Sequence, residues 1–211
     1  MDDGLTVAIA RVREVFARYP RRAVLDGCPH CRGPVTVDEH DLFSLSIRLG
    51  NTVGDRHDVK SLLPVLFERL VTATELDPGI VLGKLRREEW RTWPATEQSA
   101  VDGYLEAVWR SLLAEYPARL GSFLDASTFL GAASSAGESI DRFLAVWEAT
   151  QGPAADRHLA EAVGEMARGS GARTPWLRRG AVRDRLCRAF ERDHEESWAD
   201  DLARAYDLLL P

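Results

Sequence analysis

The stretch that decides the fold is residues 94–117, which read PATEQSAVDGYLEAVWRSLLAEYP. Between its two prolines, the large apolar side chains recur at intervals of three and four residues. This spacing places them on one face of an α-helix, and proline is favoured at a helix start but disfavoured further in. The stretch therefore predicts an amphipathic helix whose apolar face is Val101, Tyr104, Leu105, Val108, Trp109, Leu112, Leu113 and Tyr116.

The same periodicity recurs on both sides of this stretch. Apolar stripes of helical spacing run through residues 5–19, 59–71, 140–147, 159–166, 182–190 and 198–209, separated by short connections rich in Gly, Pro and Asp. Helices joined by short loops pack as antiparallel neighbours. We therefore expect an all-α fold, an irregular array of about nine or ten antiparallel helices that is a HEAT-like α-solenoid or a helical bundle. Residues 1–211 are expected to form one domain, weakly divided near 117–121 and with a short linker at 169–174.

Residues 36–50 are compatible with two structures. The apolar positions 43, 45, 47 and 49 alternate as in a strand, whereas positions 42, 45, 49 and 53 fit a helix. Thr36 and Glu39 have the spacing of a capping box, and Gly50 suits a helix C-terminus. We therefore expect a helix here, preceded by a loop over residues 20–35 and with no strand in the chain.

Composition and charge exclude several classes of protein. The chain has 211 residues, of which 45% are hydrophobic and 28% charged, and its formal net charge is −6. A disordered chain is poorer in apolar residues, and a nucleic-acid-binding domain is basic. An arginine-rich stretch at 168–192 is followed at once by an acidic stretch at 193–207, which favours mutual pairing over phosphate binding. We therefore expect a globular protein that does not bind nucleic acid.

The chain lacks the signals of export and membrane insertion. Its N-terminus carries Asp2 and Asp3 where a signal peptide needs basic residues, and no apolar run approaches the ~18 residues of a membrane helix. The 3 cysteines do not form the even framework of a disulfide-stabilised secreted domain. These features predict a cytoplasmic protein without membrane contact.

The sharpest short motif is Cys28-Pro29-His30-Cys31, in which two thiols have the spacing of a zinc knuckle. Zinc takes about four ligands, and no second C-x-x-C pair exists. A complete site therefore needs a second copy of the chain or ligands from His30, His40, His57 and Cys187. No cofactor is expected other than this zinc ion.

The motif has two other interpretations. C-P-H-C resembles the active-site motif of periplasmic thiol-disulfide oxidases of the thioredoxin fold, in which a helix N-terminus lowers the pKa of the first thiol. Here Arg32-Gly33-Pro34 follows where that helix should run, and no strand is expected before the motif. The remaining interpretation is a compact loop with inert cysteines.

Lysine is rare in this chain, because only Lys60 and Lys84 are lysine among its 27 basic residues. A lysine retained among arginines indicates a place that needs a compact charge with an adjustable pKa. Both lysines lie in polar segments, which gives a candidate site made of Asp55, His57, Lys60, Lys84, Trp90 and Trp93. The alternative is that Asp55 caps a helix, the lysines are solvated and the tryptophans belong to the core.

Three segments of the first half resemble a family of uncharacterised bacterial helical proteins. These are the C-P-x-C loop, GDRHDVKSLLPVLFERL at 54–70 and GKLRREEWRTWP at 83–94. The resemblance implies an all-α, HEAT-like array and no established activity, so no catalytic residue follows from it.

Functional expectations follow from motifs that are missing as well as from those present. The chain contains no phosphate-binding loop, no H-E-x-x-H, no G-x-S-x-G and no dinucleotide fingerprint. Serial amphipathic helices without a catalytic motif favour a non-enzymatic module that binds another protein. The alternatives are a zinc or thiol protein that uses Cys28 and Cys31, and an enzyme whose polar site lies near residues 55–60 and 84–93.

Overall fold

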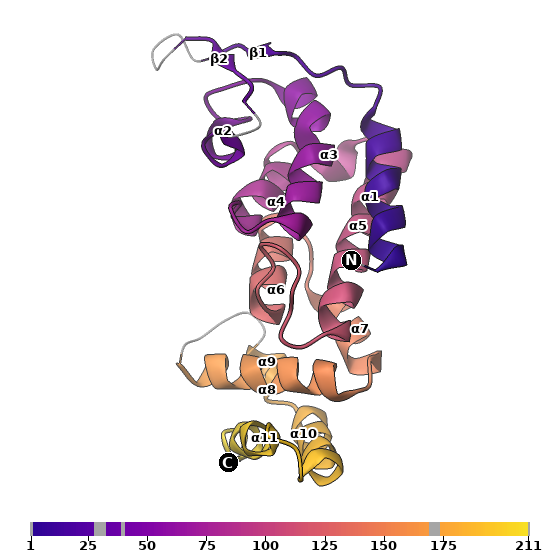
Figure 1. The fold of residues 1–211 in the computed structure, drawn as a ribbon, viewed down its shortest axis with the longest axis vertical. Coiled ribbons are helices and arrows are strands. Elements are labelled where there is room, and N and C mark those ends of the chain that lie inside the picture. The colour runs from indigo at the N-terminus through magenta and orange to yellow at the C-terminus, as the bar shows by residue number, and fades with distance from the viewer. Residues whose placement is uncertain (1, 28–32, 39–40, 169–173, 211) are drawn as a thin grey trace.

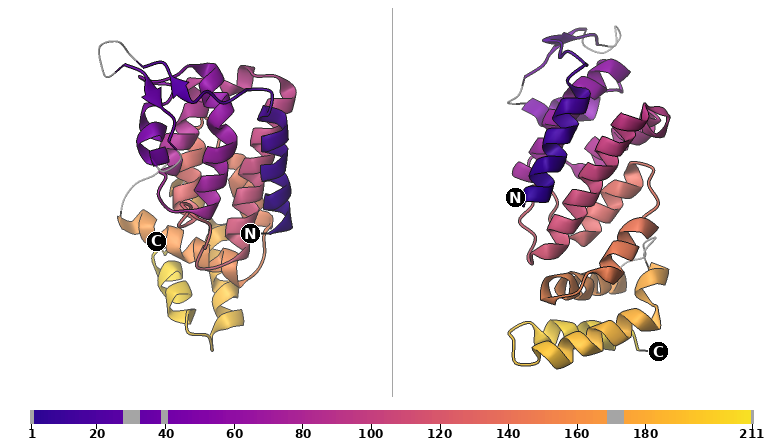
Figure 2. Two further views of the ribbon diagram at one scale, coloured as in Figure 1. Left: turned by 45° about the horizontal axis from the view of Figure 1, so that its top comes forward. Right: turned by 90° about the vertical axis from the view of Figure 1, so that its right-hand side faces the viewer.

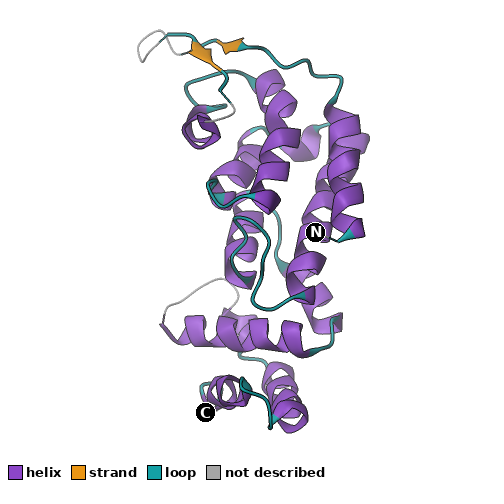
Figure 3. Cartoon of the chain, viewed as in Figure 1, coloured by secondary structure: helices purple, strands orange, loops and turns teal. Residues whose placement is uncertain are grey.

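The computed structural model describes residues 2–27, 33–38, 41–168 and 174–210. Helix accounts for 68% of the structure, and the described residues form eleven α-helices and one two-stranded sheet (Figure 1, Figure 3). The all-α class predicted from the apolar periodicity is confirmed. The elements in chain order are α1 (Asp3–Phe16), β1 (Val24–Leu25), β2 (Val35–Thr36), α2 (Leu42–Arg48), α3 (Arg56–Thr72), α4 (Pro78–Arg87), η2 (Trp90–Thr92), α5 (Ala95–Ala114), α6 (Ala126–Ser135), α7 (Asp141–Ala149), α8 (Pro153–Arg168), α9 (Thr174–Leu177), α10 (Gly180–Asp193) and α11 (Ala199–Asp207).

Aspartate side chains define where many of these helices begin. At five helix starts an aspartate accepts a hydrogen bond from a backbone N–H of the first turn, which satisfies a donor that the helix itself leaves free. At α3, Asp55 and Asp58 form a reciprocal capping box, which confirms the expected role of Asp55 as a cap. The five caps are Asp2, Asp41, Asp55, Asp77 and Asp125.

The helices are stacked along the long axis of the molecule (Figure 2). α1 packs against α3 and α5, α4 packs against α6, and α8 packs against both α10 and α11. Several of these partners are not adjacent in the chain, so the stack is built from contacts between alternate helices as well as neighbours. The described residues contribute to one continuous hydrophobic core that extends from Leu5 in α1 to Ala205 in α11. A regular HEAT-like repeat stays a prediction.

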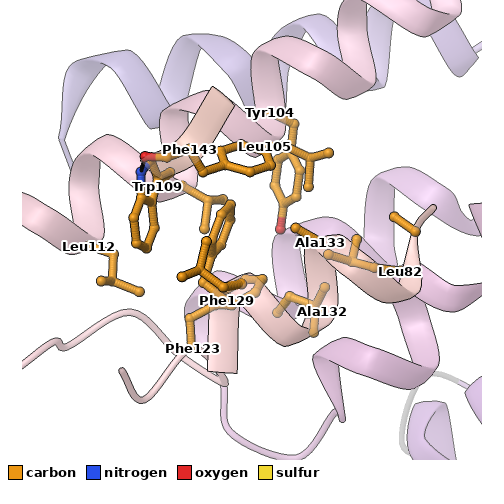
Figure 4. Packing of buried hydrophobic residues seen from close by; sticks show 14 of the residues in the cluster. Leu82, Tyr104, Leu105, Trp109, Leu112, Phe123, Phe129, Ala132, Ala133 and Phe143 are labelled. Carbon is orange, nitrogen blue, oxygen red and sulfur yellow. Dashed lines mark hydrogen bonds between the residues drawn. The ribbon is translucent and has the colours of Figure 1, made fainter. Parts of the chain in front are cut away.

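Trp109 lies at the centre of an aromatic cluster that joins α5, α6 and α7 (Figure 4). Its ring stacks on Phe129 with the centroids 4.8 Å apart, and it meets Trp147 edge-on at 5.3 Å. Its indole N–H donates to the Phe143 carbonyl at 2.9 Å, so the one polar atom of the side chain is also satisfied. Trp90, Trp93, Trp147 and Trp176 are buried as well, which confirms that most of the tryptophans are core residues.

The expectation for residues 20–50 was wrong in two places. Val24 and Leu25 pair with Thr36 and Val35 in a short antiparallel hairpin, so the chain does contain strands and one of them precedes the cysteine motif. Thr36 therefore belongs to β2 and does not cap a helix. The helix begins later, at Leu42. The sequence pattern missed the strands because two residues are too few to establish an alternation.

Among the described residues, one ion pair joins the two C-terminal stretches of opposite charge, between the adjacent residues Arg192 and Asp193 at 2.5 Å. Among the described residues, no ion pair joins α10 to α11. The α10 arginines point instead to α8, where Asp156 binds Arg185 at 2.6 Å and Arg192 at 2.9 Å. Arg185 also donates to the backbone carbonyls of Trp147 and Thr150, both at 2.7 Å. This buried network attaches the last two helices to the rest of the stack.

Candidate functional site

Lys60 forms the most deeply buried ion pair of the predicted polar site. Its ammonium donates to the Glu97 carboxylate at 2.8 Å, and the side chains of Lys60 and Glu97 are only 8% and 0% exposed. The ammonium also lies 4.3 Å from the centre of the Trp93 ring. Glu97 occupies the first turn of α5, where the helix dipole favours a negative charge.

The segment that follows α1 completes this cluster. Tyr19 donates its hydroxyl hydrogen to Glu97 at 2.6 Å and accepts from Lys60 at 3.2 Å, while Arg18 forms a further ion pair with Glu97. His57 contacts the Tyr19 ring edge-on at 5.1 Å. The Glu97 carboxylate thus accepts three donors and the Lys60 ammonium has two acceptors. Both charges are neutralised inside the fold. The cluster thus links the segment after α1 to α3 and α5.

Lys84 and Trp90 make separate contacts elsewhere. Lys84 is 4% exposed and donates to the Leu49 carbonyl at the end of α2, at 2.7 Å. Trp90 is buried, and its indole N–H donates to the Ala136 carbonyl at 3.1 Å. The expectation that the lysines are solvated was therefore wrong, because both ammonium groups replace water with protein acceptors.

We expect Lys84 to make stability depend on alkaline pH. Burial, reinforced by the nearby Arg87, lowers the pKa of Lys84 from 10.5 to about 8. Between these values the unfolded chain holds the proton and the folded chain releases it, so the free energy of unfolding rises with pH by up to about 1.4 kcal/mol per pH unit. Urea denaturation of the native protein and of Lys84→Met between pH 7 and about 10.5 measures this effect. Curves that stay parallel across this window would contradict it.

Asp55 belongs to a fourth group of contacts, at the start of α3. The Arg22 guanidinium donates to Asp58 at 2.7 Å and approaches Asp55 to 3.5 Å. Burial raises the pKa of Asp58, but hydrogen bonds from Arg22 and from the Asp55 backbone outweigh it and hold this pKa below its usual value. This group fixes the segment before β1 to the helix start.

The six residues of the predicted polar site are thus distributed over four sets of contacts. Lys60 and Trp93 share one, with His57 attached through Tyr19. The backbone N–H of His57 also donates to Asp55 at 2.8 Å.

Glu97, which is the centre of the set that holds Lys60, was not among the residues predicted from the sequence. The only feature of Glu97 that the sequence shows is its place in the first turn of α5, the helix with the clearest apolar periodicity. Many solvated carboxylates occupy such a position.

The predicted metal or thiol site lies mostly outside the described residues. Cys28, His30, Cys31 and His40 fall in the segments that the structure leaves out. Cys187 lies in α10, is partly exposed, and has its sulfur 3.9 Å from a carboxylate oxygen of Glu191. Across the described ranges, no three His, Cys, Asp or Glu side chains are grouped so that they could hold a metal ion. The zinc and thiol interpretations stay predictions.

The structure reveals a pocket between α8 and α11 that the sequence analysis did not anticipate. Its volume is about 440 Å³. The small residues Ala160, Gly164 and Ala167 of α8 line one side, and Leu202 and Ala205 of α11 line the other. Because these side chains are short, the two helices leave a hollow that no other described element fills.

Polar groups surround this apolar lining. Arg157 lies with its guanidinium carbon 4.2 Å from the ring centre of Tyr116, which borders the same pocket. Burial, with the nearby Glu161, raises the pKa of the Tyr116 phenol, so it stays a neutral hydrogen-bonding group. Asp201 and Arg204 pair with each other at 3.0 Å. The pocket thus combines apolar surface with a few polar groups, as ligand-binding pockets generally do.

Comparison with known proteins identified no similar protein. No protein-family model matches the chain, and neither the curated proteins nor the solved structures gave a match. The resemblance to bacterial helical proteins therefore stays a prediction. In the part of the chain that is described, no helix is both long and apolar enough to cross a membrane.

Proposed function

We propose that this protein is a non-catalytic binding module that takes a segment of a partner protein into the pocket between α8 and α11. The observation that carries the proposal is the pocket itself. Its volume of about 440 Å³ lies within the range of ligand-binding pockets, and its apolar lining is bordered by polar groups.

The shape of the lining favours a polypeptide segment. Ala160, Gly164 and Ala167 follow one another at helical spacing, so small side chains continue along α8 for about 10 Å. A backbone can approach such a surface closely, because no long side chain stands in its way. Leu208 borders the pocket and is exposed, and Leu210 beyond it is exposed too, so apolar surface continues outside the hollow.

The contacts of the two lysines support a non-catalytic role. Lys60 is held by Glu97 and Tyr19, and Lys84 by the Leu49 carbonyl. A general base or nucleophile needs a free lone pair within reach of a substrate. Both lysines are buried and donate to protein acceptors, and neither borders the pocket.

Peptide selection with a pocket-blocking variant tests this proposal. Random twelve-residue peptides displayed with free C-termini are selected on the native protein, and the affinity of each selected peptide is measured by calorimetry. Ala167→Trp places a large ring on the exposed rim of the pocket, and we expect it to weaken binding at least about tenfold. Ala10→Trp, at an exposed position of α1, is the matched control and should leave affinity unchanged.

Two results would refute the proposal. The first is that no peptide is selected by the native protein. The second is that the selected peptides bind Ala167→Trp as tightly as they bind Ala10→Trp, because binding would then take place on another surface.

A further inference from the structure

Arg157 borders the pocket with its guanidinium held against two aromatic rings. Its guanidinium carbon is 4.2 Å from the ring centre of Tyr116 and 4.5 Å from that of Trp198. Cation–π contacts use the face of a guanidinium, whereas its five N–H donors point outward in the plane. Among the described residues, no hydrogen bond or ion pair uses these donors. The two rings thus orient the Arg157 side chain, but no anion of the described chain neutralises its positive charge.

This environment sets Arg157 apart from comparable arginines. Every other arginine of the described chain that is at least partly buried has a polar partner. These arginines and their partners are Arg22 with Asp58, Arg48 with the Ser44 carbonyl, Arg69 with Glu75, Arg142 with Asp102, Arg183 with Asp184 and Arg185 with Asp156. A partly desolvated guanidinium without an anion is unusual because burial of a charge costs free energy unless the charge is paired.

The two carboxylates of the same pocket do not supply that anion. Asp201 pairs with Arg204, and Glu161 has its nearest cationic partner in the ring of His158, 3.8 Å from Nδ1. Glu161 lies one helical turn from Arg157, where pairing is easy, yet the guanidinium turns instead to the rings. Arg157 therefore offers its donors to a group from outside the chain.

Behind Glu161 lies the buried ring of His158. This ring is 1% exposed, and its Nε2 atom lies 3.0 Å from the carbonyls of both Leu112 and Glu115. Since both neighbours are acceptors, Nε2 carries a hydrogen. The Nδ1 atom is buried without a hydrogen-bond partner and lies 3.8 Å from a carboxylate oxygen of Glu161. His158 does not line the pocket, so of these two residues only Glu161 is open to a bound segment.

We propose that Arg157 binds a carboxylate of the partner segment, while Glu161 accepts N–H donors from the same segment. This inference rests on the proposed function and names the chemistry that it uses. A forked guanidinium matches a carboxylate through two parallel hydrogen bonds, and a peptide supplies N–H groups close to any carboxylate. The carboxylate is either the C-terminus of the partner or an Asp or Glu side chain, which share this recognition.

The test uses the peptides selected on the native protein, each in three forms. One form has a free C-terminus, the second a C-terminal amide, and the third has Asp and Glu replaced by Asn and Gln. We expect one of the two modifications to weaken binding about 10- to 100-fold, because a hydrogen-bonded charge pair contributes that much. The modification that does so identifies the source of the carboxylate.

Variants of Arg157 complete the test. In Arg157→Gln the three peptide forms should bind alike, since the group that distinguishes them is gone. Arg157→Lys, which keeps the charge but lacks the fork, should recover only part of the loss. Arg86→Gln, at an exposed position of α4, is the matched control. Thermal denaturation of each variant shows that it is folded.

The outcomes separate this inference from the proposed function. Peptides that Ala167→Trp excludes, but that bind equally well in all three forms, would leave the proposed function standing and overturn the role of Arg157. Native affinity in Arg157→Gln would overturn it too. Failure to select any peptide refutes the proposed function and, with it, the proposed carboxylate site.

Discussion

Replacement of Glu97 by glutamine is expected to lower the free energy of unfolding by about 3–5 kcal/mol. The substitution preserves the shape of the side chain but leaves the buried ammonium of Lys60 without a counter-charge. Tyr19 and Arg18 lose the charged acceptor that they share. A buried charge that loses its partner retains the cost of leaving water, which is why the effect exceeds that of a surface pair. Urea denaturation followed by circular dichroism measures the change.

Two further variants test the cause of this loss. Glu106 is exposed on the same helix and pairs with Arg110 at 2.7 Å, so Glu106→Gln should cost less than about 0.5 kcal/mol. The double variant Lys60→Met, Glu97→Leu removes both charges together and should recover much of the stability, because apolar pairs often replace buried ion pairs without loss. Equal effects of Glu97→Gln and Glu106→Gln would show that burial of the pair does not matter.

Truncation of Trp109 to alanine is expected to cost about 3–5 kcal/mol. The substitution opens a cavity among Phe129, Phe143 and Trp147 and removes the hydrogen bond to the Phe143 carbonyl. Close-packed side chains relax only in part around such a cavity. The variant therefore loses van der Waals contacts as well as the free energy gained when the indole leaves water. The free energy of unfolding from urea denaturation gives the size of the effect.

Leu124→Ala serves as the surface control for Trp109→Ala. Leu124 is 65% exposed, and its truncation should change the free energy of unfolding by no more than about 0.5 kcal/mol. Trp109→Phe keeps an aromatic ring and should lose less stability than Trp109→Ala. If Trp109→Ala were as mild as Leu124→Ala, the aromatic cluster would not hold α5, α6 and α7 together.

Most of the helices were predictable because their signals are local. An apolar stripe at spacings of three and four, as along α5, needs no knowledge of the rest of the chain. The same is true of Asp55 and Asp77, which bond to backbone groups within the next turn. The strands β1 and β2 escaped prediction since two residues make no pattern, and their pairing joins segments that are separated by the cysteine loop.

The candidate site was predictable only in part. The rarity of lysine drew attention to Lys60 and Lys84, and the structure buries both side chains. Their partners were not predictable, because Glu97 is 37 residues from Lys60 and the Leu49 carbonyl is 35 residues from Lys84. A sequence gives no measure of which distant groups meet, and an acidic residue in a first helical turn is ordinary.

The sequence by itself determined the helices, most of their beginnings and the side chains that face the core, because all of these depend on interactions within a turn or two of the chain. Tertiary structure alone decided which helices meet, that both lysines are buried, and that Arg157 stands against Tyr116 and Trp198 beside an open pocket. The physical reason is the same in each case. Burial and charge pairing depend on groups that are distant in the chain, and only the packed structure brings those groups together.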